Sequence, residues 1–401
     1  MDRSQAKVSV IIPTYNRAAL VVQTVDSILG QTRPPDEVIV VDDGSPDETA
    51  NVLSAYGGRI RYLYQRNAGR PTALNRGVAA AAGEYIWIMD DDDLALPDAL
   101  ERHLAFLSDH PEVDFSYSGY YRFTGDHAPT SLPEQDEMAC SALEESDFFI
   151  RLMIWFQFYM QGMLVPAECY RSVGPFDESL GFGDDYDMIL RLARRFRGGR
   201  LDSPTFLFRE HDGARGPANE RRAAEEREAA LRRYDKQIMS KLRAELPLVE
   251  YLPRGSAGDR LGPAQRREAL LQRACIMVRH ELFDEAFADI SAALAEGGGN
   301  ELSDREQRLF SHILNVEGWW LERHRQFTAR MGAFLRKRGA WTALEACGVG
   351  LGWRLAAALR NGQYASALRT TAHLRRLTGT ARIPAVARMA VRRRYRQPAI
   401  H

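Results

Sequence analysis

The chain has 401 residues, of which 45% are apolar and 27% charged, and its formal net charge is −1. This composition is typical of a globular protein with about two to three domains, and the charge balance gives no indication of nucleic acid as a partner. The four cysteines lie far apart without a CxxC pair, which argues against a disulfide framework and a thiolate zinc site. The first apolar run is too short for a signal peptide, and no stretch has the length of a membrane span. We therefore expect a cytoplasmic enzyme.

Strand and helix signals alternate over the first part of the chain. Continuous apolar runs predict strands over 8–12, where Pro13 ends the run, and over 37–41, 60–64 and 85–89. Helices are predicted between them over 20–29, 47–56 and 71–82. This alternation is typical of a mostly parallel α/β sheet with helices on both faces, in which ligands bind beyond the carboxyl ends of the strands.

The pattern changes after residue 97. A helix over 97–108, a strand over 113–121, a variable loop to about 141 and helices around Phe148 and Asp185 are predicted before a Gly/Pro-rich segment at 213–219. No strand signal follows. We predict an α/β domain over 1–218 and an all-α region over 219–401, with a linker helix over 219–250 and a bundle or repeat-like part over 260–401. The segment 264–297 resembles one tetratricopeptide unit.

Three predicted strand ends carry groups suited to a nucleotide. After the first strand, Tyr15 could stack on a base and Arg17 could bind a phosphate. After the second, Asp43 could accept from a base or a ribose, while its neighbours form a turn. After the third, Asn67 lies in a turn and Arg70 opens a helix, which suits a phosphate or a base carbonyl. Loops that only turn the chain and cap helices fit each of these patterns as well.

The fourth strand ends in four aspartates, Asp90 to Asp93. Carboxylate oxygens suit Mg2+ and Mn2+, and the strand period of two places Asp90 and Asp92 on one side. Asp91 and Asp93 then act as spacers that face the ligand or solvent. A solvated acidic turn is the alternative, and the register of the metal ligands stays open by one residue.

Two further polar groups follow later in the chain. Asp184 and Asp185 begin a helix whose apolar face follows from Ile189 onward. Asp185 could act as a general base, although helix capping is a common use of acids at this position. His211 precedes the Gly-rich boundary and could be a third metal ligand if the aspartates lie nearby.

Together these segments resemble glycosyltransferase family 2. The resemblance covers about residues 8–215 and consists of five ordered motifs: VSVIIPTYNR, EVIVVDDGS, NAGRPTALNRG, YIWIMDDDDLALP and FDESLGFGDDYDMILRLA. It implies the Rossmann-like GT-A fold and an inverting, nucleotide-sugar-dependent transferase that uses Mn2+ or Mg2+. One departure is that the family usually has Glu-Asp where this chain has Asp184-Asp185.

The family pattern implies roles for individual residues. Asp185 corresponds to the catalytic base, and Asp184 and Gly162 fall on the acceptor side. Asp90, Asp92 and His211 correspond to the metal and diphosphate site. With the loop residues described above, the predicted nucleotide-sugar site comprises Pro13, Thr14, Tyr15, Arg17, Asp43, Asn67, Arg70, Asp90 and Asp91.

The resemblance implies transfer of a sugar, most often from UDP, to a hydroxyl of a glycan or lipid-linked acceptor in bacterial surface polysaccharide synthesis. Two other functions remain open. A non-catalytic nucleotide-sugar-binding or scaffold protein could use the same loops. A nucleotidyltransferase also uses metal-bound aspartates, although it usually has a Gly-rich phosphate loop that PTYNRAAL lacks.

Arginine recurs among apolar residues from Thr342 onward, and no acidic residue follows Glu345. Basic amphipathic helices of this kind can lie on an anionic membrane, here the inner face of the plasma membrane. A helical bundle with a solvated arginine face fits the same pattern, and both interpretations stay open.

Overall fold

The computed structural model describes residues 3–127, 129, 137–138, 148–210, 224–256, 258, 260–296, 301–315 and 318–379. The chain divides into two compact units, Met1–Ile238 and Met239–His401. This division lies within the helix α8 (Ala224–Glu245). The boundary expected near 218 falls on residues outside the described ones and stays a prediction.

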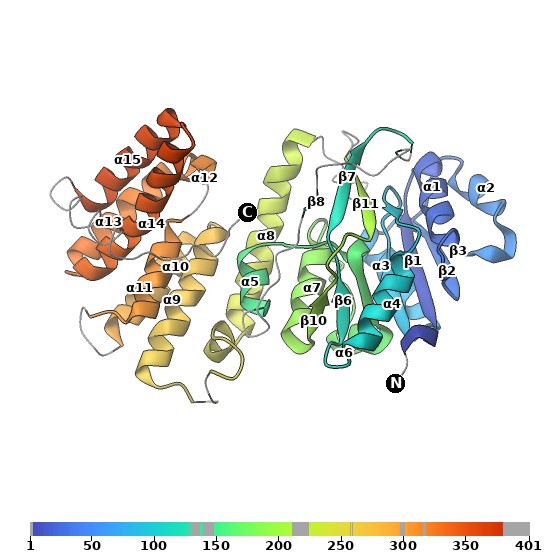
Figure 1. Cartoon of the computed structure of the whole chain (residues 1–401), viewed down its shortest axis with the longest axis horizontal. Coiled ribbons are helices and arrows are strands. Elements are labelled where there is room, and N and C mark those ends of the chain that lie inside the picture. Colours follow the sequence, from blue (N-terminus) through green and yellow to red (C-terminus); the bar gives the residue numbers. More distant parts are fainter. Residues whose placement is uncertain are drawn as a thin grey trace. The chain divides into compact units, whose positions relative to one another are not determined.

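A seven-stranded sheet forms the centre of the first unit (Figure 1). Its order is β10 (Gly198–Arg200), β6 (Phe115–Tyr117), β9 (Met163–Pro166), β4 (Tyr85–Ile88), β1 (Val8–Thr14), β2 (Glu37–Asp42) and β3 (Arg61–Tyr64). Strand β9 is antiparallel to both of its neighbours, and the other pairs are parallel. The mostly parallel α/β sheet expected from the sequence is confirmed.

Helices cover both faces of this sheet. Alternate residues of β2 divide between two apolar clusters, with Val38 and Val40 packing on one side and Ile39 and Val41 on the other. The first cluster includes α1 and α4 residues, and the second includes Ala73 of α3. Burial on both faces explains the continuous apolar runs in the sequence. The helices of this unit before α8 are α1 (Ala18–Leu29), α2 (Thr49–Ser54), α3 (Arg70–Ala80), α4 (Ala99–Asp109), α5 (Phe148–Ile154), α6 (Ala167–Val173) and α7 (Asp184–Arg195).

A second sheet of four strands lies beside the acidic loop. Its order is β5 (Leu94–Ala95), β11 (Phe206–Glu210), β7 (Tyr120–Thr124) and β8 (Glu137–Met138). The single strand predicted over 113–121 is therefore wrong, because β6 and β7 belong to different sheets. The strand β5 follows the acidic loop and fixes its exit by antiparallel pairing with β11.

Strand β1 continues through Pro13, where the sequence predicts its end. The Met89 N–H donates to the Ile11 carbonyl in the last ladder bond on the β4 side, at 3.0 Å. Thr14 instead faces β2, where its carbonyl accepts from the Asp43 N–H at 2.9 Å. Pro13 therefore faces the side on which β4 has ended, and its missing N–H interrupts no continuing ladder.

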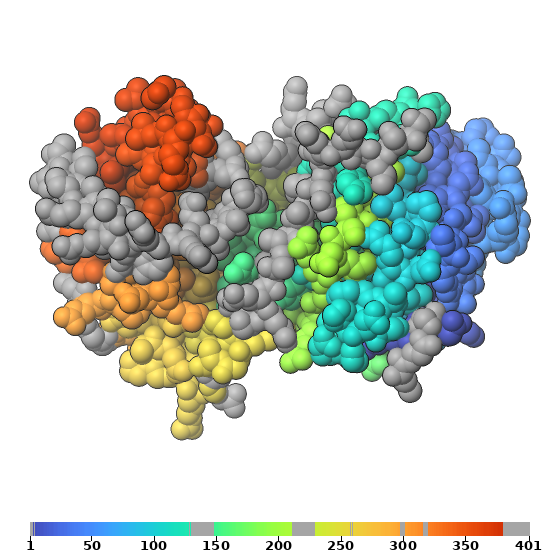
Figure 2. Space-filling view, in the orientation of Figure 1, coloured from blue at the N-terminus to red at the C-terminus, as the bar shows by residue number. Residues whose placement is uncertain are grey.

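The second unit is helical over its described residues, which include no strand. Its helices after α8 are α9 (Pro263–Arg279), α10 (Phe283–Ala295), α11 (Asp304–Ile313), α12 (Gly318–Arg323), α13 (Arg325–Lys337), α14 (Trp341–Arg360) and α15 (Tyr364–Thr378). Figure 2 shows the surface of this unit in yellow to red. The expected all-α region is confirmed.

Two glycines allow close helix packing in this second unit. A Cβ on Gly350 of α14 would lie 2.1 Å from the Ser311 carbonyl oxygen of α11, and one on Gly332 would lie 2.3 Å from the Leu377 carbonyl oxygen. Among the residues described, no helix is long and apolar enough to span a bilayer. Residues 380–401, which include part of the predicted membrane contact, lie outside the described residues, and that contact stays a prediction.

Candidate active site

A cavity of about 730 Å³ opens where β1, β2 and β4 end and where α3 and α7 begin. This volume lies in the usual range for small-molecule sites. It is lined by twelve of the predicted site residues: Pro13, Thr14, Tyr15, Arg17, Asp43, Asn67, Arg70, Asp90, Asp91, Asp92, Asp184 and Asp185. The cavity thus joins segments that are distant in the sequence.

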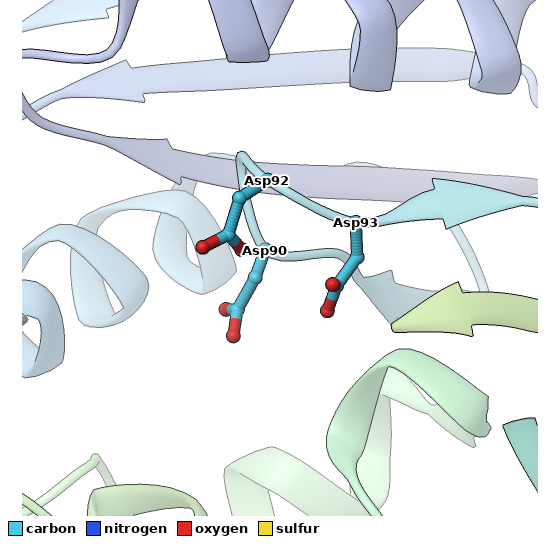
Figure 3. A group of neighbouring side chains, drawn as sticks. All are labelled: Asp90, Asp92 and Asp93. Carbon is cyan, nitrogen blue, oxygen red and sulfur yellow. The ribbon is translucent and has the colours of Figure 1, made fainter. Parts of the chain in front are cut away.

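Three of the four strand-end aspartates form one carboxylate group. Asp90, Asp92 and Asp93 each offer an oxygen, and these oxygens lie within 4.8 Å of one another. Figure 3 shows the three side chains leaving the loop on the same side. Asp91 is not part of this group, and its carboxylate accepts from the Thr14 hydroxyl and from Arg17, both at 2.7 Å. Oxygen ligands in this arrangement suit a hard divalent cation, so the donor set fits Mg2+ or Mn2+.

Donors from several elements hold the acidic loop. Arg17 Nη1 lies 2.7 Å from Asp91 Oδ1 and 2.7 Å from Asp92 Oδ2. The Gln161 side-chain amide donates to Asp90 at 2.7 Å and to Asp93 at 2.9 Å. The charge of Asp91, and then that of Asp92, raises the pKa of Arg17 above its usual value despite burial. The repulsion expected of four adjacent acids is therefore offset by specific donors.

Arg209 fixes the same loop from β11. Its backbone N–H donates to Asp93 Oδ1 and its Nε to the Asp92 carbonyl, both at 2.8 Å. The side chain is 1% exposed, and its guanidinium lies 4.5 Å from the centre of the Phe123 ring. Arg209 therefore holds both the backbone of the loop at Asp92 and the carboxylate of Asp93. His211, which follows two residues later, lies outside the described residues.

Arg70 connects the acidic loop to the start of α7. Its Nη2 lies 2.7 Å from Asp90 Oδ1, and its Nη1 forms an ion pair with Asp184. Burial lowers the pKa of Arg70, but the charges of Asp184, Asp90 and Asp185 outweigh this effect and raise it. Arg70 therefore holds the carboxylates of two distant segments at one position.

Asp185 has fewer donors than its neighbours. Its Oδ1 accepts from the Tyr186 N–H at 2.8 Å. Burial, and then the charge of Asp184, raises the pKa of the Asp185 carboxyl to about 6, while Arg70 opposes the shift. A carboxyl with a pKa near neutrality inside a cavity has the properties of a general base.

Asp43 organises the loop that precedes α3. It accepts from the backbone N–H groups of Ala68 and Gly69 and from the Gln65 side chain, each at 2.8 Å. Asp42 accepts from the Tyr62 hydroxyl at 2.5 Å, and this bond helps to close the turn after β2. Asp43 also lines the cavity, so the loop that it holds lies next to the space where a ligand would bind.

Several lining residues have no signal in the sequence pattern. Gln161 lies in a short 3-10 helix, η4 (Met160–Gly162), and was not singled out. Gly162 is not among the lining residues, and a Cβ there would lie 2.8 Å from the Ser118 hydroxyl, which gives it a packing reason. The cavity lining also contains aromatic and aliphatic residues from four later segments: Phe156, Tyr159, Leu180, Phe182, Phe208, Leu231 and Tyr234.

Comparisons with known proteins agree with this geometry. Residues 9–158 match the family model described as Glycosyl transferase family 2. An uncharacterized glycosyltransferase of Rickettsia typhi is 33% identical over 189 residues, which cover 47% of this chain and 58% of that protein. The uncharacterized glycosyltransferase EpsJ of Bacillus subtilis is 29% identical over 51% of this chain and 61% of its own length.

Solved structures show a weaker likeness. The Staphylococcus aureus TarS structure of residues 1–349 with UDP-GlcNAc superposes with a TM-score of 0.49 at 19% identity, covering 82% of this chain and 85% of that one. The chain spans 58% and 61% of the two curated relatives named above. The similarity to glycosyl transferase family 2 thus lies in the N-terminal unit, over residues 9–158.

Proposed function

We propose that this protein transfers a sugar from a nucleoside diphosphate sugar, with UDP as the first nucleotide to test, to a hydroxyl of a saccharide acceptor. One observation carries this function: a single cavity contains the Asp90 and Asp92 carboxylates, Asp185 as a base, and Arg70 between them. A nucleotide-sugar transferase must stabilise a leaving diphosphate and deprotonate a hydroxyl in the same space.

Three carboxylates would hold the divalent metal, those of Asp90, Asp92 and Asp93. Bound there, Mn2+ or Mg2+ would neutralise negative charge on the diphosphate of the donor. Arg17 already donates to Asp92 and lines the cavity, so its guanidinium is placed to meet a phosphate oxygen as well. Tyr15 and Asp43 line the part of the cavity that would receive the base and ribose.

The base chemistry belongs to Asp185. Its ionised carboxylate would take the proton of the acceptor hydroxyl as that oxygen forms a bond to the anomeric carbon. The bond from this carbon to the diphosphate oxygen breaks at the same time, and its electron pair leaves with the nucleoside diphosphate. Attack and departure on opposite faces invert the anomeric configuration, and no covalent intermediate forms.

The name of one further relative is consistent with a role in polysaccharide synthesis. The putative teichuronic acid biosynthesis glycosyltransferase TuaG of Bacillus subtilis is 36% identical over 143 residues. We include in this proposal an acceptor that belongs to a bacterial surface polysaccharide or its lipid-linked precursor, and a location at the cytoplasmic face of the membrane.

A panel of nucleotide sugars, incubated with the full-length chain with and without Mn2+ or Mg2+, tests the proposal. We expect metal-dependent release of a nucleoside diphosphate from one donor, slowly with water and faster with an acceptor. Binding of nucleotide sugars without any turnover would instead indicate a binding or scaffold protein. Release of pyrophosphate from a nucleoside triphosphate would indicate a nucleotidyltransferase.

A further inference from the structure

The helix α8 forms part of the cavity wall, although it lies well beyond the segment that matches the family model. The Tyr234 ring lies 6.0 Å from the Phe182 ring, between centroids. A Cβ built on Gly183, the residue before α7, would lie 3.3 Å from Ile238 Cδ1. These contacts place α8 directly against the start of α7, where Asp185 lies.

Asp235 of α8 lines the cavity without a partner. Among the described residues, the structure shows no hydrogen bond or ion pair to its carboxylate, and Asp185 is the charged group that acts on it. Burial, followed by the charge of Asp185, raises the pKa of Asp235 to about 7. A second carboxyl thus interacts with the proposed base, and no arginine among the described residues pairs with it.

Apolar and aromatic side chains line the same cavity as these two acids. The Tyr159 and Phe208 rings are stacked with centroids 5.0 Å apart, and Phe156 meets Tyr186 edge-on at 5.5 Å. Leu231 of α8 is 44% exposed although it lines the cavity. An exposed leucine in a cavity wall is available to contact a ligand.

This combination matches the chemistry of a pyranose ring. Such a ring has an apolar face of C–H groups that packs on aromatic side chains, and hydroxyl donors at its edge that carboxylates accept. An anionic or phosphate-bearing group is disfavoured, since Asp185 and Asp235 would repel it. A second metal ion is also disfavoured, because aromatic rings supply no further oxygen ligands.

We propose that α8 completes an acceptor subsite for a pyranose, in which Tyr234 and Phe182 pack on the ring and Asp235 accepts from its hydroxyl groups. This inference rests on the proposed function, since it assumes that Asp185 faces the acceptor. It assigns Asp235 and Tyr234 as specificity-determining residues supplied by a segment outside the family match. Free glycans and lipid-linked saccharides present the same ring.

Titration calorimetry tests the subsite by direct binding. Methyl pyranosides of glucose, galactose, mannose and N-acetylglucosamine are titrated into the full-length chain saturated with UDP and Mn2+. We expect at least one to bind wild type, and Asp235→Asn to weaken that pyranoside tenfold or more while the Kd for UDP changes less than about twofold. Glu245→Gln, which removes an exposed acid of the same helix, is the matched control and should change neither value.

A second pair of variants examines the ring contact. Tyr234→Leu should weaken the pyranoside about tenfold, and Tyr234→Phe, which keeps the aromatic face, should not. Decyl pyranosides below their micelle concentration distinguish the source, because stronger binding than the methyl compounds indicates a lipid-linked acceptor and equal binding a free glycan. Decanol is the control for the alkyl chain alone.

The outcomes separate this inference from the proposed function. Absence of binding by every pyranoside, or unchanged pyranoside affinity in both Asp235→Asn and Tyr234→Leu, overturns the subsite. Equal weakening of UDP and pyranoside in Asp235→Asn also overturns it, since the effect would then be general. A protein that binds a pyranoside through Asp235 but releases no nucleoside diphosphate from any donor retains the subsite and loses the proposed function.

Discussion

The acidic side chains at the two ends of the cavity differ in the number of donors that they have. At the strand ends, the acids of the 90–93 loop accept from Arg17, Arg70, Gln161 and the Arg209 backbone. At the helical end, Asp185 accepts from one neighbouring N–H, and Asp235 has no partner among the described residues. The protein supplies its own counter-charges where we propose that a diphosphate and its metal bind. It leaves acids unpaired where hydroxyl donors are proposed to arrive.

This contrast separates two physical roles for a carboxylate. A charge with built-in donors is held ionised and in place, which suits a ligand set that must be ready before the donor arrives. A buried charge without donors has a raised pKa and can exchange a proton near neutrality. The following variants break or sharpen this comparison, from the largest expected effect to the smallest.

Asp185→Asn should produce the largest loss. An amide cannot accept the proton of the acceptor hydroxyl, so kcat for transfer should fall by about 10²- to 10⁴-fold. Metal-dependent UDP binding, measured by calorimetry, should persist because the strand-end acids are untouched. Transfer at the wild-type rate would remove Asp185 from the role of base.

Asp92→Asn and Asp91→Asn should differ, although the residues are adjacent. Asp92 belongs to the carboxylate group at the cavity, so its amide variant should weaken Mn2+-dependent UDP binding by about 10- to 100-fold. Asp91 accepts from Thr14 and Arg17 and is not part of that group. Its variant should lower the melting temperature by several degrees while changing the Mn2+ dependence of UDP binding much less. If Asp91→Asn weakened Mn2+-dependent UDP binding more than Asp92→Asn, Asp91 would be the metal ligand in place of Asp92.

The pH dependence of transfer reports the ionisation of Asp185. Asp185 must be ionised to act as a base, and its pKa is raised to about 6. The value of kcat/KM should therefore decline about tenfold per pH unit below about pH 6 and level off above it. UDP affinity at each pH serves as the control for loss of the metal site. Constant kcat/KM down to pH 4 would contradict the assignment.

Asp235→Asn should have the smallest effect, on stability. The folded-state pKa of about 7 lies above the unfolded value of about 3.9, so the folded chain holds this proton more tightly. The contribution of Asp235 to stability is therefore greatest below pH 4 and is lost as pH rises toward 7. At pH 8 the variant should melt several degrees above wild type, because it lacks the buried charge, and near pH 4 the two should coincide. A lower melting temperature at pH 8 would indicate an undetected partner.

The sequence predicts the strand-end half of the site well, because apolar runs mark strands whose ends meet at one edge. The arrangement of the four aspartates depends on the residue at which β4 ends, because side chains alternate between the two sides only along the strand. β4 ends at Ile88, and the Asp93 N–H then donates to the Asp90 carbonyl at 3.3 Å in a turn. This turn brings Asp93 back to the side of Asp90, which an extended strand would not do.

The helical end could not be predicted for a different reason. The spacing of Leu231, Tyr234 and Ile238 gives α8 an apolar face, but periodicity does not identify the element against which that face packs. The partner is Phe182 and Gly183, about fifty residues earlier in the chain. Pro13 is a second example of this limit of sequence-based prediction. Strand β1 can continue through this proline only because the neighbouring strand β4 has already ended, and the sequence does not show where β4 ends relative to β1.

The order of cavity residues along the chain has an evolutionary consequence. Lining residues up to Asp92 come from the strand ends and the start of α3, whereas those from Phe156 to Asp235 come from later segments. A recombination event between residues 92 and 156 would exchange one set of lining residues for that of a homologue and leave the other intact. Such a chimaera is constrained by Arg70, which pairs with Asp184, and by Gln161 and Arg209, which donate to the acidic loop. A lineage that keeps these contacts could acquire new acceptors by inheriting a new downstream segment, without altering its donor.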